Sequence, residues 1–186
     1  EAAALARAAD EARQPPPRPP AELDLTLAGT RLRGTVEGLW SSGLARHQFA
    51  RVKARSLLEL WIQHLAALLA DPGFAGTSVL VGRPGSSRRT RSGTVALVRV
   101  PRQRAEHALA GLVELYWRGQ QQPLLFFPET SRAHAEAELA APDEPQSWLR
   151  AARGCWHGRP ESPGEGDDPR LRRLLGEAEP FDAERA

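Results

Sequence analysis

The sequence predicts an α/β (α+β) domain in which a mixed sheet is flanked by helices. Segments with strand periodicity and segments with helical periodicity follow one another in the order strand, strand, helix, strand, strand, helix. β-branched residues gather in the segments 77–81 and 94–100, as is typical of strands. The chain has 186 residues, which is enough to bury a hydrophobic core without disulfides or metals.

A local sequence pattern predicts each helix and strand. Leucines alternate with polar residues over 23–27, and a turn and a second alternating run follow, which predicts a hairpin. Leucines and Trp61 recur at helical spacing over 55–70. The expected elements are a helix over 1–13, a hairpin over 22–38, a strand over 47–53, a helix over 55–70, strands over 77–81 and 94–100, a helix from Pro101 to Gly119, and helices over 130–140, 145–148 and 170–175.

The prolines divide the chain into a short N-terminal part and one main domain. Pro15 to Pro20 include five prolines, which favour a stiff, extended linker. We therefore expect a helix and linker over 1–21 and a single domain over 22–186. No initiator methionine is present, so we expect the chain to be a fragment of a longer subunit.

Several finer expectations concern burial and capping. The apolar run 123–127 is expected to be buried, and Trp61 and Trp117 are expected to pack in the core because both lie in long helices. Thr130 or Ser131 could cap the helix that follows, and Asp168 could cap the last one.

The composition excludes some classes of protein. Lys53 is the only lysine, beside 24 arginines, and methionine is absent, which indicates codon bias rather than function. The single cysteine, Cys155, excludes a disulfide framework. No apolar run approaches the roughly 20 residues of a membrane span, and the start is not that of a signal peptide. We expect a soluble, cytoplasmic bacterial protein with no membrane partner.

The net charge of +2 hides an uneven distribution. Residues 31–55 carry six basic residues and one acid, and residues 83–104 carry seven arginines and no acid. Residues 129–144 carry five acids and one arginine, and residues 161–185 carry eight acids and four arginines. The first half could face an anionic partner and the last third a protein surface, although charged solvated faces need no partner.

The loop from Arg83 to Arg91 is the best candidate for a binding site. Arginines contact phosphates in bidentate fashion, and Arg83, Arg88, Arg89 and Arg91 would lie at an exposed hairpin tip. A solvated loop without function is the alternative.

Other residue groups give no convincing site. Cys155 and His157 lack the two further ligands that zinc needs, His134 and Glu138 fit a surface ion pair, and Ser41 and Ser42 have no catalytic framing. We expect no metal and no cofactor.

Four segments resemble one family. They are 23–38, 53–65, GEGDDP at 164–169, and the most specific one, LVELYWRGQQQPLLFFPETS at 112–131. Together and in this order they resemble the C-terminal domain of RecC, the gamma chain of exodeoxyribonuclease V, over roughly 22–181.

The resemblance implies a fold like that of PD-(D/E)XK nucleases without their catalysis. It implies a place in a heterotrimer with RecB-like and RecD-like subunits that processes DNA ends and single-stranded DNA for repair and recombination. There the domain would act as scaffold and in strand separation.

The residues can be compared with the nuclease pattern that the resemblance implies. Active enzymes hold Mg²⁺ with an Asp on one strand and an Asp/Glu-x-Lys on the next. Here Glu37 falls in the first position and Lys53 in the lysine position, but Arg51 replaces the second carboxylate and would repel a cation. We therefore predict no catalysis. An active Mg²⁺-dependent nuclease and a pure protein–protein interaction module are the alternatives.

Overall fold

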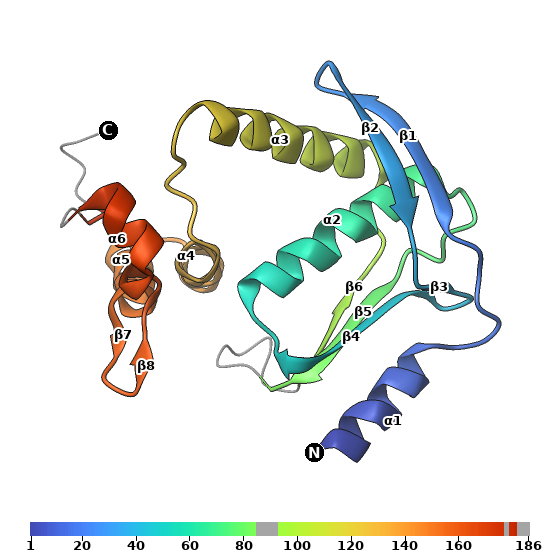
Figure 1. Ribbon diagram of the computed structural model, residues 1–186, viewed down its shortest axis with the longest axis horizontal. Coiled ribbons are helices and arrows are strands. Elements are labelled where there is room, and N and C mark those ends of the chain that lie inside the picture. Colours follow the sequence, from blue (N-terminus) through green and yellow to red (C-terminus); the bar gives the residue numbers. More distant parts are fainter. Residues whose placement is uncertain (85–92, 177–178, 182–186) are drawn as a thin grey trace. The chain divides into compact units, whose positions relative to one another are not determined.

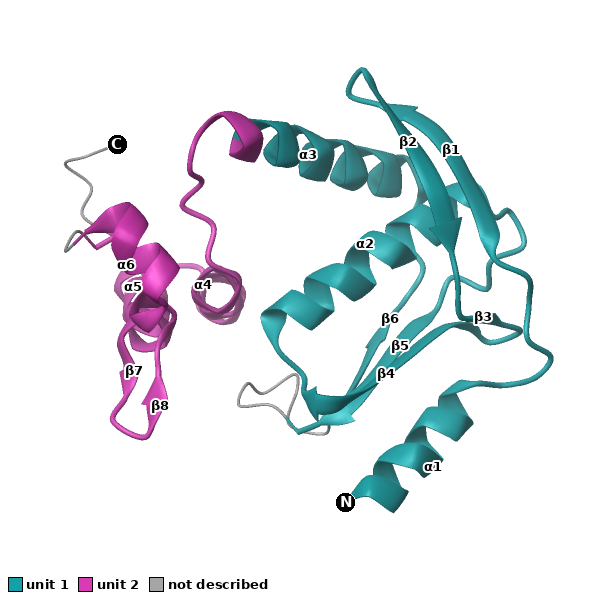
Figure 2. Cartoon of the chain, viewed as in Figure 1, with its two compact units in different colours: residues 1–118 teal, residues 119–186 magenta. Residues whose placement is uncertain are grey.

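The computed structural model describes residues 1–84, 93–176 and 179–181 (Figure 1). It contains helices and a mixed sheet, which confirms the predicted α/β class. The chain divides into two compact units, Glu1–Arg118 and Gly119–Ala186, which are coloured separately in Figure 2. These units do not test the expected boundary between residues 21 and 22, which stays a prediction.

The elements follow one another along the chain within these units. Unit 1 contains α1 (Ala2–Ala12), β1 (Ala21–Leu27), β2 (Thr30–Val36), β3 (Leu39–Trp40), β4 (Gly43–Arg51), α2 (Ala54–Ala70), β5 (Ser78–Arg83), β6 (Thr94–Leu97) and α3 (Arg102–Gln121), whose last residues belong to unit 2. Unit 2 also contains α4 (Pro128–Ala140), α5 (Pro145–His157), β7 (Gly158–Arg159), β8 (Ser162–Pro163), the 3₁₀ turn η1 (Glu165–Asp167) and α6 (Pro169–Leu175).

The main sheet of unit 1 has four strands in the order β3-β4-β5-β6. β4 and β5 are parallel, and β3 and β6 pair antiparallel with them at the two edges. Parallel strands need a crossover connection, and α2 supplies it. Gly43 opens β4 with a φ of 129°, and a Cβ there would lie 2.1 Å from the carbonyl oxygen of Thr77. The close approach of the two strands therefore requires glycine at this position.

Helices α1 and α2 cover opposite faces of this sheet. Successive residues of a strand point to opposite faces. Arg46 donates from Nε to Oε1 of Gln63 on α2 at 2.7 Å, whereas the next residue, His47, lies with Nδ1 2.6 Å from Nη2 of Arg13, which follows α1. The same arrangement is visible in Figure 1.

The β1–β2 hairpin packs on α2 and confirms the hairpin predicted over 22–38. Residues 21–27 alternate between half-buried and exposed, and their leucines pack against the core. Asp24 lies on the exposed side and accepts hydrogen bonds from Arg31 at 2.7 Å. Helix α2 thus lies between the hairpin and the sheet. Its residues Leu60 and Leu65 are buried on nearly all sides.

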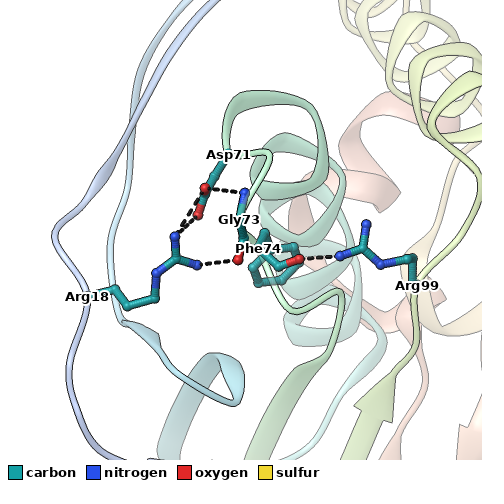
Figure 3. A network of polar contacts seen from close by, with 5 residues as sticks. All are labelled: Arg18, Asp71, Gly73, Phe74 and Arg99. Carbon is teal, nitrogen blue, oxygen red and sulfur yellow. Dashed lines mark hydrogen bonds and ion pairs between the residues drawn. The ribbon is translucent and has the colours of Figure 1, made fainter.

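Two arginines hold the turn between α2 and β5 (Figure 3). Arg18, in the proline-rich segment, contacts both carboxylate oxygens of Asp71 at 2.8 and 3.1 Å and donates to the carbonyl of Gly73 at 2.8 Å. On the other side, Arg99 donates to the carbonyl of the buried Phe74. The guanidinium of Arg18 therefore fixes the proline-rich segment to the turn after α2 within unit 1.

Unit 2 is held together by aromatic packing and a carboxylate. The rings of Phe127 and Trp156 lie 4.8 Å apart between centroids. The carboxylate of Glu165, in η1, accepts hydrogen bonds from the backbone N–H groups of Glu129 and Thr130 at 3.0 and 2.7 Å. An acceptor at this place satisfies donors of the first turn of α4 and complements the helix dipole.

Some finer expectations are wrong. Helix α3 continues past Gly119 to Gln121, and α4 begins at Pro128, because proline is well suited to the first helical turn, so neither Thr130 nor Ser131 is its N-cap. The run 123–127 is not buried as a whole, since only Phe127 is. Trp117 is 47% exposed and donates from Nε1 to Thr30 at the hairpin turn at 2.8 Å. The expected cap Asp168 is confirmed, with Oδ1 2.8 Å from the N–H of Arg170.

Candidate nucleic-acid interface

The carboxyl ends of β4 and β5 bring two separately predicted residues together. Arg51, the last residue of β4, lies opposite Arg83, the last residue of β5. The N–H of Val52 donates to the carbonyl of Arg83 at 3.1 Å. Adjacent strands are about 4.8 Å apart, so the two arginine side chains leave the sheet side by side and on one face. A predicted DNA contact thus lies beside a predicted degenerate nuclease position.

Lys53 adds a third cation at the same end of the sheet. It is exposed and is the N-cap residue of α2, so the predicted strand over 47–53 ends two residues earlier than expected. The N-terminus of a helix carries a partial positive charge. The positive end of α2 and three basic side chains therefore lie near one another.

An exposed aromatic ring accompanies these cations. Phe49 is 64% exposed and lies two residues before Arg51, in the part of β4 where the register with β5 is irregular. The guanidinium carbon of Arg83 lies 5.9 Å from the centroid of its ring, within the range of a cation–π contact. Sequence reasoning missed Phe49, because an aromatic residue in a strand ordinarily packs in the core. The only available signal was its position two residues before Arg51.

Helix α1 borders this surface. Its N-cap residue, Glu1, places Oε1 2.7 Å from Nε of Arg83. An open groove of about 410 Å³ lies between α1 and β4, and Leu5, Gln48 and Phe49 are among its lining residues. The Glu1–Arg83 pair is solvent-exposed, so we expect it to contribute at most about 1 kcal/mol.

Three of the predicted DNA contacts, Arg88, Arg89 and Arg91, lie outside the described residues. Their contribution to this surface stays a prediction. Arg83 is the one member of the predicted set that the structure places.

Glu37 is not brought to the same place as Lys53. It is exposed and follows β2, which belongs to the hairpin and not to the main sheet. Its neighbour Gly38 accepts a hydrogen bond from Ala45 near the start of β4 at 3.1 Å, whereas Lys53 follows the end of that strand. Six positions along a strand span about 20 Å. The two predicted nuclease positions therefore lie near opposite ends of β4.

The charge of Glu37 acts on an arginine. Partial burial lowers the pKa of Arg46, and the negative charge of Glu37 partly opposes this shift. Within residues 1–84, 93–176 and 179–181, no group of three or more His, Cys, Asp or Glu residues could hold a metal ion.

The remaining candidates from the sequence have structural roles. The hydroxyls of Ser41 and Ser42 donate to backbone carbonyls of residues 12–15 and so hold the segment after α1. Nδ1 of His134 lies 3.9 Å from Oε2 of Glu138, at the one-turn spacing expected for a surface pair. Burial raises the pKa of the Cys155 thiol, which makes it less reactive, and Nε2 of His157 lies 3.2 Å from Oε1 of Glu179.

Comparisons with known proteins identify the family of this chain. The family described as the RecC C-terminal domain matches residues 1–139, and the chain therefore belongs to this family. It is 28% identical over 162 residues to the RecBCD enzyme subunit RecC of Mycobacterium tuberculosis, in strain H37Rv and in strain CDC 1551. It is 30% identical over 126 residues to the subunit of the same name from Mycolicibacterium smegmatis.

These matches cover most of the present chain but little of the relatives. The aligned part is 87% of this chain and 14% of each M. tuberculosis protein, and 67% and 11% for the M. smegmatis protein.

No helix in the described parts of the chain is long and apolar enough to cross a bilayer.

Proposed function

We propose that this chain is a non-catalytic domain of the gamma-type subunit of a helicase–nuclease complex that processes DNA double-strand breaks for recombinational repair. In this role it acts as a scaffold and in strand separation, together with RecB-like and RecD-like subunits. The observation that carries the proposal is the basic cluster at the carboxyl ends of β4 and β5 in a chain of the RecC C-terminal domain family.

The names of the relatives support the proposed RecB-like and RecD-like partners. Each is called a RecBCD enzyme subunit, which describes those proteins as parts of an enzyme with several subunits. The proposed DNA contacts are Arg83 and the loop arginines Arg88, Arg89 and Arg91.

Two features support the absence of catalysis. Arg51 occupies the position where a nuclease of this resemblance would have a carboxylate, and its guanidinium offers donors but no oxygen ligand for a cation. Glu37 and Lys53 lie near opposite ends of β4, so they cannot orient one water molecule between them.

The acidic composition of unit 2 favours a second, compatible role. Residues 129–144 have a charge of −4, with five acids and one arginine. A surface of this kind suits contact with a basic protein surface and not with DNA. We propose that unit 1 faces DNA and that unit 2 contributes to subunit contacts.

The experiment that tests the function uses the parent subunit co-expressed with tagged RecB-like and RecD-like subunits. We expect the three to co-purify, and we expect the complex with Arg83→Ala and the three loop arginines replaced by alanine to assemble normally but to unwind duplex ends more slowly. Assembly without any effect on unwinding would contradict the DNA-contact role. Failure to co-purify would contradict the scaffold role. Mg²⁺-dependent DNA cleavage by the chain itself, abolished by Glu37→Ala, would support the alternative of an active nuclease.

A further inference from the structure

We propose that Phe49, Arg51 and Arg83 form a site for one nucleotide of single-stranded DNA, in which the two guanidiniums bind a phosphate and the phenyl ring stacks on the unpaired base. This inference rests on the proposed function, since it specifies which form of DNA this surface takes and by which residues. It also gives Arg51 a role of its own. At the position where a carboxylate would attract a cation, the arginine creates a site for an anion.

The phosphate part of the site follows from strand register. Arg51 and Arg83 are direct partners across the parallel strands, so their side chains start about 5 Å apart on the same face. Two guanidiniums at this spacing can reach one phosphate, and arginine forms bidentate hydrogen bonds with phosphate oxygens. Lys53 lies at the same end of the sheet and adds positive charge to the surroundings.

The base part of the site follows from the exposure of Phe49. Phe49 is 64% exposed and so presents its ring to water, with the guanidinium carbon of Arg83 5.9 Å from the centroid of the ring. Aromatic side chains beside a basic groove are the common platform for unpaired bases. Bases inside a duplex already stack on both faces, so a single exposed ring selects single-stranded DNA over duplex DNA.

Glu1 competes with the phosphate for one of the two cations. Its carboxylate lies 2.7 Å from Nε of Arg83, and the side chain of Glu1 is 56% exposed. A phosphate in this site would contact two arginines, Arg51 and Arg83, whereas the carboxylate of Glu1 contacts Arg83. We therefore infer that DNA displaces Glu1, and that removing its charge strengthens binding.

The test measures binding of the 186-residue chain to a fluorescent DNA strand of about 12 nucleotides, which lies within the range that small single-strand sites cover. The same strand annealed to its complement is the duplex probe. We expect Phe49→Ala to weaken single-strand binding about fivefold or more and to leave duplex binding unchanged, because stacking is lost only for unpaired bases. Arg51→Ala should lower the slope of log affinity against log salt by about 0.7, the value for one phosphate contact on a single strand. Glu1→Gln should strengthen binding about twofold.

Two variants serve as matched controls. Val98→Ala removes an apolar side chain that is 72% exposed, next to the end of β6 that pairs with the start of β5. Arg33→Ala removes an arginine on the exposed side of the hairpin. Both should bind the single strand like the unchanged chain, and circular dichroism should show that all five variants are folded.

The outcomes separate the site from the wider function. The stacking site would be overturned if Phe49→Ala weakened binding to single-stranded and duplex DNA equally, or weakened neither. An unchanged salt slope for Arg51→Ala would overturn the phosphate site. Either result leaves co-purification with the partner subunits intact, so the proposed scaffold role would stand. If the variants showed these effects on DNA binding but the parent subunit did not co-purify with its partners, the nucleotide site would stand and the proposed scaffold role would be contradicted.

Discussion

The guanidinium of Arg18 is expected to stabilise unit 1 more than any exposed ion pair of the hairpin. Arg18→Ala removes three contacts of 2.8 to 3.1 Å, two to the carboxylate of Asp71 and one to the carbonyl of Gly73. The Asp71 side chain is only 15% exposed, so water replaces the lost partner poorly. The N–H of Gly73 still donates to Asp71 at 2.9 Å, which limits the penalty.

The magnitude follows from these contacts. Hydrogen bonds to charged groups contribute about 1.5–3 kcal/mol when buried, and exposed ion pairs contribute about 0–1 kcal/mol. A pair between these limits should contribute about 2 kcal/mol to the free energy of unfolding. For a chain of this length, 1 kcal/mol shifts the melting temperature by roughly 2–4 °C. We therefore expect Arg18→Ala to lower the melting temperature by about 4–8 °C.

The assay is thermal unfolding followed by circular dichroism, with two comparison variants. Arg18→Lys keeps the charge but lacks the planar guanidinium that contacts Asp71 and Gly73 together. Its melting temperature should therefore fall between those of the unchanged chain and Arg18→Ala. Arg33→Ala breaks an exposed pair with Asp24 at 3.4 Å and should shift the melting temperature by less than about 2 °C. A shift of under about 1 °C for Arg18→Ala, or an equal loss for Arg33→Ala, would refute this reasoning.

Three further predictions concern other parts of the chain. His64 is fully buried, with Nδ1 2.8 Å from Ser78 Oγ, and burial lowers its pKa. Its contribution to stability is therefore complete above pH 6.5 and is lost as the pH falls below that value. Melting curves of His64→Gln between pH 7.5 and 5 should show a weaker pH dependence than those of the unchanged chain. Gly43→Ala should cost about 3 kcal/mol or more, because its Cβ would overlap the Thr77 carbonyl, and a melting temperature like that of the unchanged chain would argue against the strand geometry. Glu165→Ala should cost about 1–2 kcal/mol and speed amide exchange in the first turn of α4, whereas unaltered exchange there would show that the carboxylate does not cap it.

Periodicity predicted the elements that bury one face. The alternating leucines of the hairpin and the apolar stripe of α2 are visible in the sequence because each faces the core at a regular interval. The expected strand before α2 was also found, but β4 begins four residues earlier, at Gly43, where a buried start carries no alternation. Trp117 was assigned to the core from its place in a long helix, and periodicity does not reveal that the hairpin turn offers Thr30 as a partner.

The candidate site could be predicted only in part, because it depends on which strands are neighbours. The sequence identified Arg83 and Arg51 for separate reasons, but it does not give the register of β4 and β5 that makes these two residues partners. It also suggested that Glu37 and Lys53 share a site, which would require their strands to be adjacent. Among the described strands, however, β2 forms a separate two-stranded sheet with β1. Likewise, the segments 112–131 and 164–169 are recognisable as patterns, but only the fold shows Glu165 at the start of α4.

The crossover between β4 and β5 has a consequence for folding. The two arginines lie on opposite sides of α2 in the chain, so they meet only after this whole helix has docked and the loop has closed. Parallel pairings of this kind form late, because the entropy of closure is lost before the strand contacts are gained. A nascent chain that ends before β5 carries Arg51 without its strand neighbour Arg83. The two arginines are therefore neighbours only in a chain in which the crossover through α2 has closed.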